Sequence, residues 1–321
     1  MKKAFAEGPH AMSTESLSFE QLHIDVARNS TDDFNPFHDP QRWGRIAGNP
    51  FGSTIALGFQ MEMLAADRVA AQRGLVERCC QDEENGLHFT NYEFHFARAL
   101  AAGEPFQVQV KGTVAGARAA GISNRVLLRS ADGGLVLRGT VSETPEPRFL
   151  RDQMPSGLPS LEHLPDRTRV PGTPYFAKRK FMNASNAKNF LLGCLCRQQD
   201  YLDELSERVC FPPMFTASLL SCALLEKGWA ERYDFEADPM VYTSHQISVD
   251  NRLQARVRSN DSLYILVQGP LPTEPIRGLG GGQVAQQQYH CFGMLHGREL
   301  LFRASVKLAP LHGFPAPGGA R

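Results

Sequence analysis

The sequence Asp33-Phe-Asn-Pro-Phe-His38 is followed, after a short spacer, by Pro50-Phe-Gly-Ser-Thr-Ile-Ala-Leu-Gly58 and then by an apolar run from Phe59 to Ala66. An Asn-Pro step breaks a helix and favours a turn. Small residues that precede an apolar run without later breakers are typical of the start of a buried helix. We therefore expect a turn that brings Asp33 and His38 together, followed by a long buried helix.

The same order of elements occurs twice along the chain. An apolar helical segment, an alternating strand and a closing strand recur at residues 51–66, 89–96 and 135–141, and again at 211–225, 242–249 and 300–306. Alternation of apolar and polar residues is typical of a half-buried strand. The repetition predicts an α+β protein built by duplication. In this alignment Ser218 stands in the second copy where Gly58 stands in the first.

The two copies are separated by a proline-rich connector, because hydrophobic periodicity lapses between Glu143 and Pro174. We expect a first domain at residues 1–143, a linker at 144–175 and a second domain at 176–321. A sheet that curls around one helix leaves an open edge, and a second such unit can cover it. We therefore predict two antiparallel sheets, each wrapping a central helix, joined as a pseudo-dimer.

Composition excludes several classes of protein. Lys plus Arg (34) equals Asp plus Glu (34) over 321 residues, so no net charge attracts nucleic acid or an anionic membrane. No stretch reaches the ~20 apolar residues of a membrane span, and no secretory apolar core follows Met1-Lys2-Lys3. A cytoplasmic protein is expected. The seven cysteines lack Cys-x-x-Cys pairs, which favours free, mostly buried thiols and no metal site.

Asp33 and His38 are the best candidates for chemistry. A carboxylate and an imidazole that share one water molecule suit proton transfer near neutral pH. The hexapeptide alone leaves a simpler alternative open, in which Asp33 caps a turn and His38 lies on the surface. The neighbouring segments favour the catalytic interpretation.

The region from about residue 17 to 142 resembles the MaoC-like family. Its signature is Asp-x-Asn-Pro-x-His, then a short spacer and the glycine-bearing start of a central helix, matched here by the segments 33–38 and 50–58. The resemblance continues through the strand 87–96 and the turn Ala102-Gly103-Glu104. The family usually has His before the helix glycine, where this chain has Leu57.

The resemblance implies a double hot-dog fold and a hydro-lyase of fatty acid metabolism. Such an (R)-specific enoyl-thioester hydratase or 3-hydroxyacyl-thioester dehydratase adds or removes water at the 2,3-position of an acyl thioester. Asp33 and His38 would hold the water and exchange protons, and the Gly58 N–H would stabilise the enolate-like oxygen. Asn35, Phe51 and Leu57 are the expected substrate-binding residues. No separate cofactor is implied, because coenzyme A or the phosphopantetheine of acyl carrier protein is part of the substrate.

The second half carries no Asp-x-Asn-Pro-x-His motif. We therefore expect a catalytically silent unit that completes the sheet and shapes the acyl tunnel, in a chain that is a monomeric pseudo-dimer or a homodimer. Two other functions stay open. A hot-dog thioesterase would direct the water at the thioester carbonyl, and a non-catalytic subunit would only bind the acyl thioester.

Overall fold

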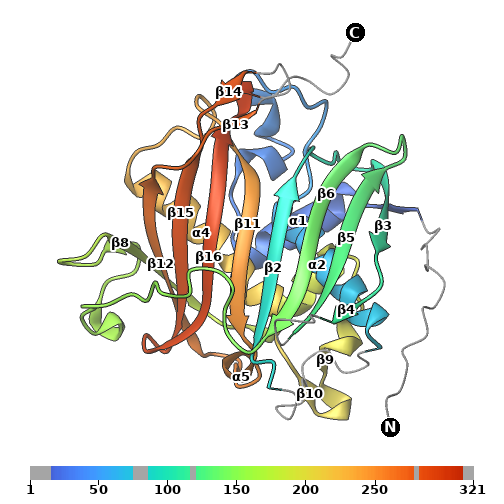
Figure 1. The fold of residues 1–321 in the computed structure, drawn as a ribbon. Helices are drawn as coiled ribbons and strands as arrows, with labels where there is room; N and C mark the ends of the chain where they lie inside the picture. The colour runs from blue at the N-terminus through green and yellow to red at the C-terminus, as the bar shows by residue number, and fades with distance from the viewer. Residues whose placement is uncertain (1–15, 75–85, 116–120, 278–281, 314–321) are drawn as a thin grey trace.

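The computed structural model describes residues 16–74, 86–115, 121–277 and 282–313. A single antiparallel sheet of 12 strands dominates it, with the long helices on one face (Figure 1). The strand order is β1-β3-β5-β6-β2-β11-β16-β15-β12-β8-β7, and β4 pairs with β5.

The first half supplies two helices and one side of the sheet. Its elements are β1 (Leu17–Ser18), α1 (Gln21–Thr31), α2 (Gly58–Gln72), β2 (Phe89–Phe96), β3 (Pro105–Val110), β4 (Val114–Ala115), β5 (Ile122–Ser130) and β6 (Leu135–Thr144). Two short 3-10 helices, Pro36–His38 and Trp43–Arg45, lie between α1 and α2.

The second half repeats this arrangement. Its elements are β7 (Thr168–Arg169), β8 (Tyr175–Phe181), α3 (Ala184–Gly193), β9 (Leu202–Asp203), β10 (Arg208–Val209), α4 (Pro213–Ala230), β11 (Met240–Asp250), α5 (Asn251–Gln254), β12 (Ser262–Leu271), β13 (Ile276–Arg277), β14 (Gln283–Val284), β15 (Gln287–Leu295) and β16 (Glu299–Pro310). The small pairs β9–β10 and β13–β14 lie outside the main sheet.

The duplicated α+β architecture predicted from the sequence is confirmed. Helix α2 precedes β2, β3, β5 and β6, and helix α4 precedes β11, β12, β15 and β16 in the same relative order within the sheet. The predicted joining of the two halves as a pseudo-dimer is also confirmed. Their sheets are continuous, because β2 and β11 pair at the centre, from Phe89 with Asp250 to His95 with Ser244. Because this pairing is continuous, neither β2 nor β11 exposes an unpaired strand edge at the centre of the sheet.

Helix α1 positions the loop that follows it. The Glu20 N–H donates a 3.0 Å hydrogen bond to Nδ1 of His23 at the start of the helix. At the other end Asp32 adopts the left-handed conformation (φ 55°), and its N–H donates to helix carbonyls. The end of α1 therefore turns the chain into the segment that carries Asp33 and His38.

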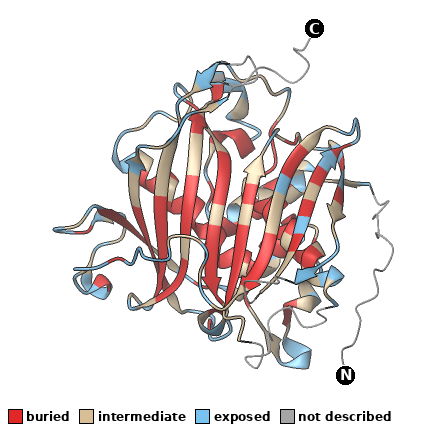
Figure 2. Cartoon of the chain, viewed as in Figure 1, coloured by how far each residue is buried: buried red, intermediate tan, exposed pale blue. Residues whose placement is uncertain are grey.

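The two central helices start differently. Helix α2 begins at Gly58, whereas α4 begins at Pro213, with Pro212 just before it. Proline is tolerated at the first helical position because the N–H it lacks has no partner there. The predicted equivalence of Ser218 and Gly58 is therefore wrong, since Ser218 lies in the second turn of α4. Most residues of the two central helices and of the central strands are buried (Figure 2).

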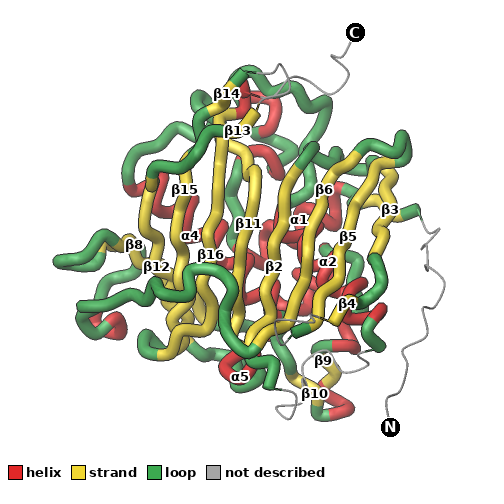
Figure 3. The backbone as a smooth tube through the Cα atoms, in the orientation of Figure 1, coloured by secondary structure: helices red, strands yellow, loops and turns green. Residues whose placement is uncertain are grey.

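The proline-rich connector packs on the opposite face of the sheet, where it crosses the central strands (Figure 3). The Arg148 N–H donates a 2.9 Å hydrogen bond to the side chain of Asn91 in β2, and the Phe149 N–H donates one of 3.1 Å to Ser248 in β11. Further along, Leu161 and Val170 join a buried apolar cluster on the outer face of the second half. The connector therefore covers part of the sheet.

In the described residues, no helix is long and apolar enough to cross a membrane. Five cysteines lie in this part of the chain and all are thiols, as expected: Cys194, Cys196, Cys210, Cys222 and Cys291. Only Cys210 is not fully buried. Cys79 and Cys80 lie outside the described residues.

Candidate active site

Asp33 and His38 lie in a buried turn, and each residue is only 6% exposed. The Asp33 N–H donates to the Arg28 carbonyl at 2.9 Å, which ties the turn to the end of α1. The Asn35 N–H donates to Asp33 Oδ1 at 3.0 Å, and Asn35 Oδ1 accepts from the Phe37 N–H at 3.1 Å. Side chains that bond their own backbone two residues on are typical of Asx turns. This turn fixes the Asp33 carboxylate.

The imidazole of His38 is held from one side. Its Nδ1 lies 2.8 Å from the Ile55 carbonyl oxygen, which can only accept, so we assign the proton to Nδ1 and the lone pair to Nε2. Burial lowers the pKa of His38, and the positive charge of Arg28 adds to that effect. The negative charge of Asp33 and the Ile55 carbonyl oppose it. The ring is therefore neutral near pH 7, with Nε2 free to accept a proton.

The second half of the chain holds the Asp33 carboxylate. Ser221, in α4, donates a 2.7 Å hydrogen bond to Asp33 Oδ2. Because the Ser221 proton points at Asp33, the Tyr242 hydroxyl must be the donor in its 3.0 Å contact with Ser221. Burial raises the pKa of Tyr242, and the nearby Asp33 charge raises it further, so Tyr242 keeps its proton. Each carboxylate oxygen of Asp33 thus accepts one identified hydrogen bond.

Gly58 lies beside this group of residues as the first residue of α2. Backbone N–H groups in a first helical turn have no partner within the helix and carry partial positive charge. A Cβ atom added at Gly58 would lie 3.0 Å from the Phe96 ring and 3.6 Å from the Tyr242 ring. The helix start, Tyr242 and Asp33 are therefore linked within one small region. Among the described residues, Asp33 and His38 themselves share no direct hydrogen bond.

The three residues expected to contact substrate differ in their surroundings. Asn35 shapes the turn from Asp33 to His38 through its backbone and side chain, as described above. Phe51 packs edge-on against Phe37 with ring centroids 5.9 Å apart, next to His38. Leu57 caps α2 and is only 2% exposed within the main core. Asn35 and Phe51 therefore line the turn, whereas Leu57 anchors the helix start.

A second polar pair lies one helical turn beyond Gly58. Glu62 in α2 and His245 in β11 are both fully buried, at 0% exposure, with Oε1 and Nδ1 2.8 Å apart. The other carboxylate oxygen, Oε2, and the other ring nitrogen, Nε2, have no hydrogen-bond partner among the described residues. Burial raises the pKa of Glu62, and the neighbouring His245 opposes that rise.

Four residues of this region were not predicted from the sequence: Ser221, Tyr242, Glu62 and His245. Glu62 carried a signal, since it is the one charged residue in the apolar run from Phe59 to Ala66. Charged side chains are rarely buried without a partner, so a specific polar contact of Glu62 could have been predicted. The other three depend on contacts between the two halves.

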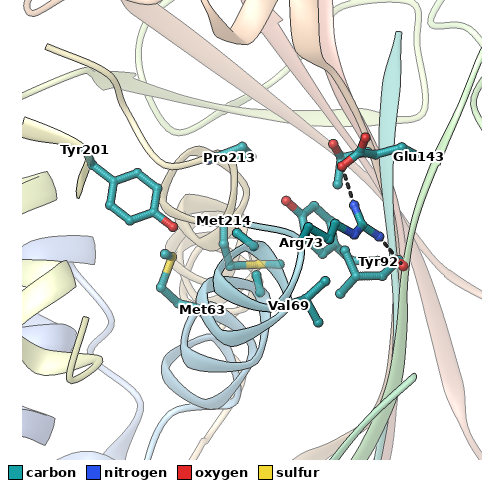
Figure 4. A pocket seen from close by; sticks show the side chains of 12 residues that line it. Met63, Val69, Arg73, Tyr92, Glu143, Tyr201, Pro213 and Met214 are labelled. Atoms are coloured by element: carbon teal, nitrogen blue, oxygen red, sulfur yellow. Dashed lines mark hydrogen bonds and ion pairs between the residues drawn. The ribbon is translucent and has the colours of Figure 1, made fainter. Parts of the chain in front are cut away.

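The start of α4 has a different environment from the start of α2. A cavity of about 40 Å³ lies there, between Pro213 and Met214 of α4, the second half of α2 and strand β2. This volume holds a few water molecules at most. Tyr201 and Met63 form part of its wall (Figure 4).

An ion pair between Arg73 and Glu143 borders this cavity (Figure 4). Arg73 also donates from Nε to Asn124 at 2.7 Å and from Nη2 to the Val141 carbonyl at 3.1 Å. All three guanidinium nitrogens are thus engaged with the protein. The described residues that line the cavity include no histidine, so they form no Asp–His arrangement like the one near Gly58.

Comparison with solved structures identifies the architecture. The structure of RV0216 from Mycobacterium tuberculosis, which has a double hot-dog fold, matches with a TM-score of 0.59 over 96% of this chain and 97% of that chain. A MaoC-like dehydratase matches with a TM-score of 0.56 over 94% of this chain and 98% of that chain. The fold is a double hot-dog. Sequence identity is 12% in both cases, so the likeness concerns the fold.

The expected double hot-dog architecture of MaoC-like proteins is therefore confirmed. No protein-family model and no curated protein sequence matches the chain. Other structural neighbours carry names that differ in activity. One is a MaoC-like dehydratase from Phytophthora capsici, with a TM-score of 0.50 at 10% identity, 92% coverage of this chain and 95% of that chain. Another is a proposed oleoyl thioesterase from Lactobacillus plantarum, with a TM-score of 0.50 at 11% identity, 95% coverage of this chain and 98% of that chain.

Proposed function

We propose that this double hot-dog protein acts on an acyl thioester and adds water to, or removes it from, the 2,3-position of the acyl group. The observation that carries the proposal is the way Asp33 and His38 are held. Both are buried, the Asp33 oxygens accept from Asn35 and Ser221, and His38 Nδ1 donates to Ile55. His38 Nε2 remains as the free basic atom of the group.

This arrangement suits general acid–base chemistry on one water molecule. In the hydration direction, the water oxygen bonds to carbon 3 while the Asp33 and His38 pair takes one of its protons. A proton returns to carbon 2, so the pair ends in its starting protonation state. A base with a pKa near the working pH is most effective in such transfers. The lowered pKa of His38 keeps it neutral and ready to accept a proton.

The start of α2 would stabilise the negative charge that develops on the thioester oxygen. A backbone N–H directed at such an oxygen from a helix start acts without reorganisation, because its position is fixed beforehand. Gly58 occupies that position, beside Tyr242 and in the same region as Asp33. The substrate thioester would be carried by coenzyme A or by acyl carrier protein.

The rival function is thioester hydrolysis, which a hot-dog fold also supports. Incubating the full chain with crotonyl-coenzyme A separates the possibilities. Hydration removes the absorbance of the conjugated double bond and releases no free thiol. Release of free coenzyme A would instead identify a thioesterase. Tight binding without either change would identify a non-catalytic acyl-thioester-binding subunit.

A further inference from the structure

We propose that Glu62 and His245 form a polar subsite that binds an uncharged hydroxyl or carbonyl group on the acyl chain, beyond the carbons that react. The inference rests on the proposed function, because it has the acyl chain extend along α2 from Gly58 towards this pair. It assigns the substrate class to oxygen-bearing acyl thioesters and not to plain fatty acyl thioesters.

The pair lies next to the proposed reaction centre. Phe96 contacts the position of a Gly58 Cβ at 3.0 Å, and its ring centroid lies 5.1 Å from that of His245. The ring of Tyr242, whose hydroxyl bonds Ser221, lies edge-on to His245 at 4.4 Å between centroids. One aromatic ring therefore separates the polar pair from the helix start, and another separates it from the residues that hold Asp33.

The distance along α2 sets the length of acyl chain required. Glu62 follows Gly58 by one helical turn, which corresponds to about 6 Å along the axis. An acyl chain whose thioester carbon lies at the start of the helix would reach Glu62 within a few carbon–carbon bonds. A group near carbon 5 fits this span.

Glu62 and His245 have unused hydrogen-bonding capacity. Both side chains are fully buried, and beyond their mutual 2.8 Å contact Glu62 Oε2 and His245 Nε2 have no hydrogen-bond partner among the described residues. A buried polar group without a partner is costly, and most such groups in native proteins are satisfied. A hydroxyl group on the substrate can bond to Glu62 Oε2 and His245 Nε2, whereas a hydrocarbon chain would leave these two atoms without a partner.

The aromatic surroundings restrict the ligand to an uncharged group. Phe59 stacks on His245 at 4.7 Å, and Phe96 and Tyr242 approach it edge-on. No further charged side chain contacts His245 among the described residues. A carboxylate on the acyl chain would face the Glu62 carboxylate in this apolar enclosure, where like charges repel strongly.

The pair is particular to the first central helix. Counting four residues from the start of each helix gives Glu62 in α2 and Ala217 in α4. A polar contact needed simply to fasten each central helix to the sheet would be expected in both copies. Glu62 lies in the helix that begins at Gly58, and the other half of the chain supplies His245. This placement fits a role in the single proposed site.

The test compares kcat/KM of the full chain for two coenzyme A thioesters of equal length, 2-hexenoyl and 5-hydroxy-2-hexenoyl. A site built to bond a hydroxyl group discriminates against an analogue that lacks it. We expect the hydroxylated substrate to be favoured by about tenfold or more, which corresponds to a difference of about 1.4 kcal/mol. The Glu62→Leu/His245→Phe double variant should lose this preference.

Thr216→Val is the matched control. Thr216 is equally buried in α4 and bonds Gln254 at 2.9 Å, away from His245, so this variant should keep the preference. Equal turnover of both substrates by the wild type, preference for a 2-hexenedioyl thioester, or an unchanged preference in the double variant would overturn the inference. If the double variant does not fold, the ratio of the two wild-type kcat/KM values is itself the test. Absence of turnover with every 2-enoyl thioester would instead refute the proposed function.

Discussion

Ser221 donates a 2.7 Å hydrogen bond to the carboxylate of Asp33, although 188 residues separate them along the chain. The bond joins the central helix of the second half to the turn that carries the proposed catalytic pair. The expectation that the second half supplies only sheet and tunnel wall is therefore incomplete. The second half also orients Asp33, and Tyr242 supports Ser221 in turn.

Replacing Ser221 with Ala should lower kcat by about 10- to 100-fold, because a hydrogen bond to a charged group contributes about 1.5–3 kcal/mol. KM should change little, since Ser221 acts through Asp33 and not on the bound acyl chain. Steady-state kinetics with crotonyl-coenzyme A measures both effects.

Ser218→Ala is the matched control for that experiment. Ser218 lies on the same helix and is also buried, but its hydroxyl bonds only the Phe215 carbonyl in its own helix. Its kcat should stay close to that of the wild type. Equal losses in both variants would show that Ser221 has no specific effect on Asp33.

The pH dependence of kcat/KM should show an acid limb with a midpoint below pH 6.5, the ordinary pKa of histidine, because burial lowers the pKa of His38. Activity requires the neutral His38 ring. The activity is therefore present above the folded-state pKa of His38 and is lost as the pH falls through that pKa. Removing the Asp33 charge in Asp33→Asn should lower the pKa of His38 further. Proton NMR of the His38 ring can follow this, and a pKa above 6.5 in the wild type would contradict the assigned environment.

The same shift has a consequence for stability. Unfolded chains take up the proton near pH 6.5, whereas folded chains do so only at lower pH. The contribution of His38 to the free energy of unfolding is therefore present above pH 6.5 and declines as the pH falls below it.

Gly193→Ala should destabilise the fold by about 1–3 kcal/mol through overpacking. A Cβ at Gly193 would lie 2.7 Å from the His23 carbonyl oxygen and 2.9 Å from Ala27, where α3 meets α1. Denaturant unfolding measures the loss. Gly44→Ala is the control, since nothing lies within 4 Å of a Cβ there. Comparable stability in both variants would mean that α1 and α3 are not in close contact.

Arg73→Met should lower the free energy of unfolding by about 3 kcal/mol, because it leaves the buried Glu143 carboxylate without its ion-pair partner. It should leave kcat unchanged, since the cavity beside Arg73 lies at the start of α4 and lacks the Asp–His pair. Calorimetric titration with a non-hydrolysable acyl-coenzyme A thioether should give one site per chain in both proteins. Two equivalent sites, or loss of kcat in the variant, would show that the second half has its own reaction centre.

Local sequence was enough to predict much of this molecule. The Asn35-Pro36 step does form the turn that buries Asp33 and His38, because an Asx turn depends only on neighbouring residues. Alternating residues correctly marked the strand Phe89–Phe96. The repeated order of elements gave the duplication.

Contacts between the halves could not be predicted in this way. Ser218 and Ser221 both lie in an apolar helix, and composition does not say which one faces Asp33. The alignment that matched Ser218 with Gly58 failed because the two helices begin with different residues, Gly58 in one case and Pro213 in the other. The buried contact of Glu62 with His245 likewise depends on how β11 lies over α2.

The most direct test of the central claim is the fate of oxygen from water labelled with oxygen-18 when the wild type and Asp33→Asn act on crotonyl-coenzyme A. The account predicts label in the 3-hydroxyl group of an intact thioester for the wild type, and a rate about 10²- to 10⁴-fold lower for the correctly folded variant. Label in a free carboxylate with release of coenzyme A, or an Asp33→Asn rate close to that of the wild type, would contradict it.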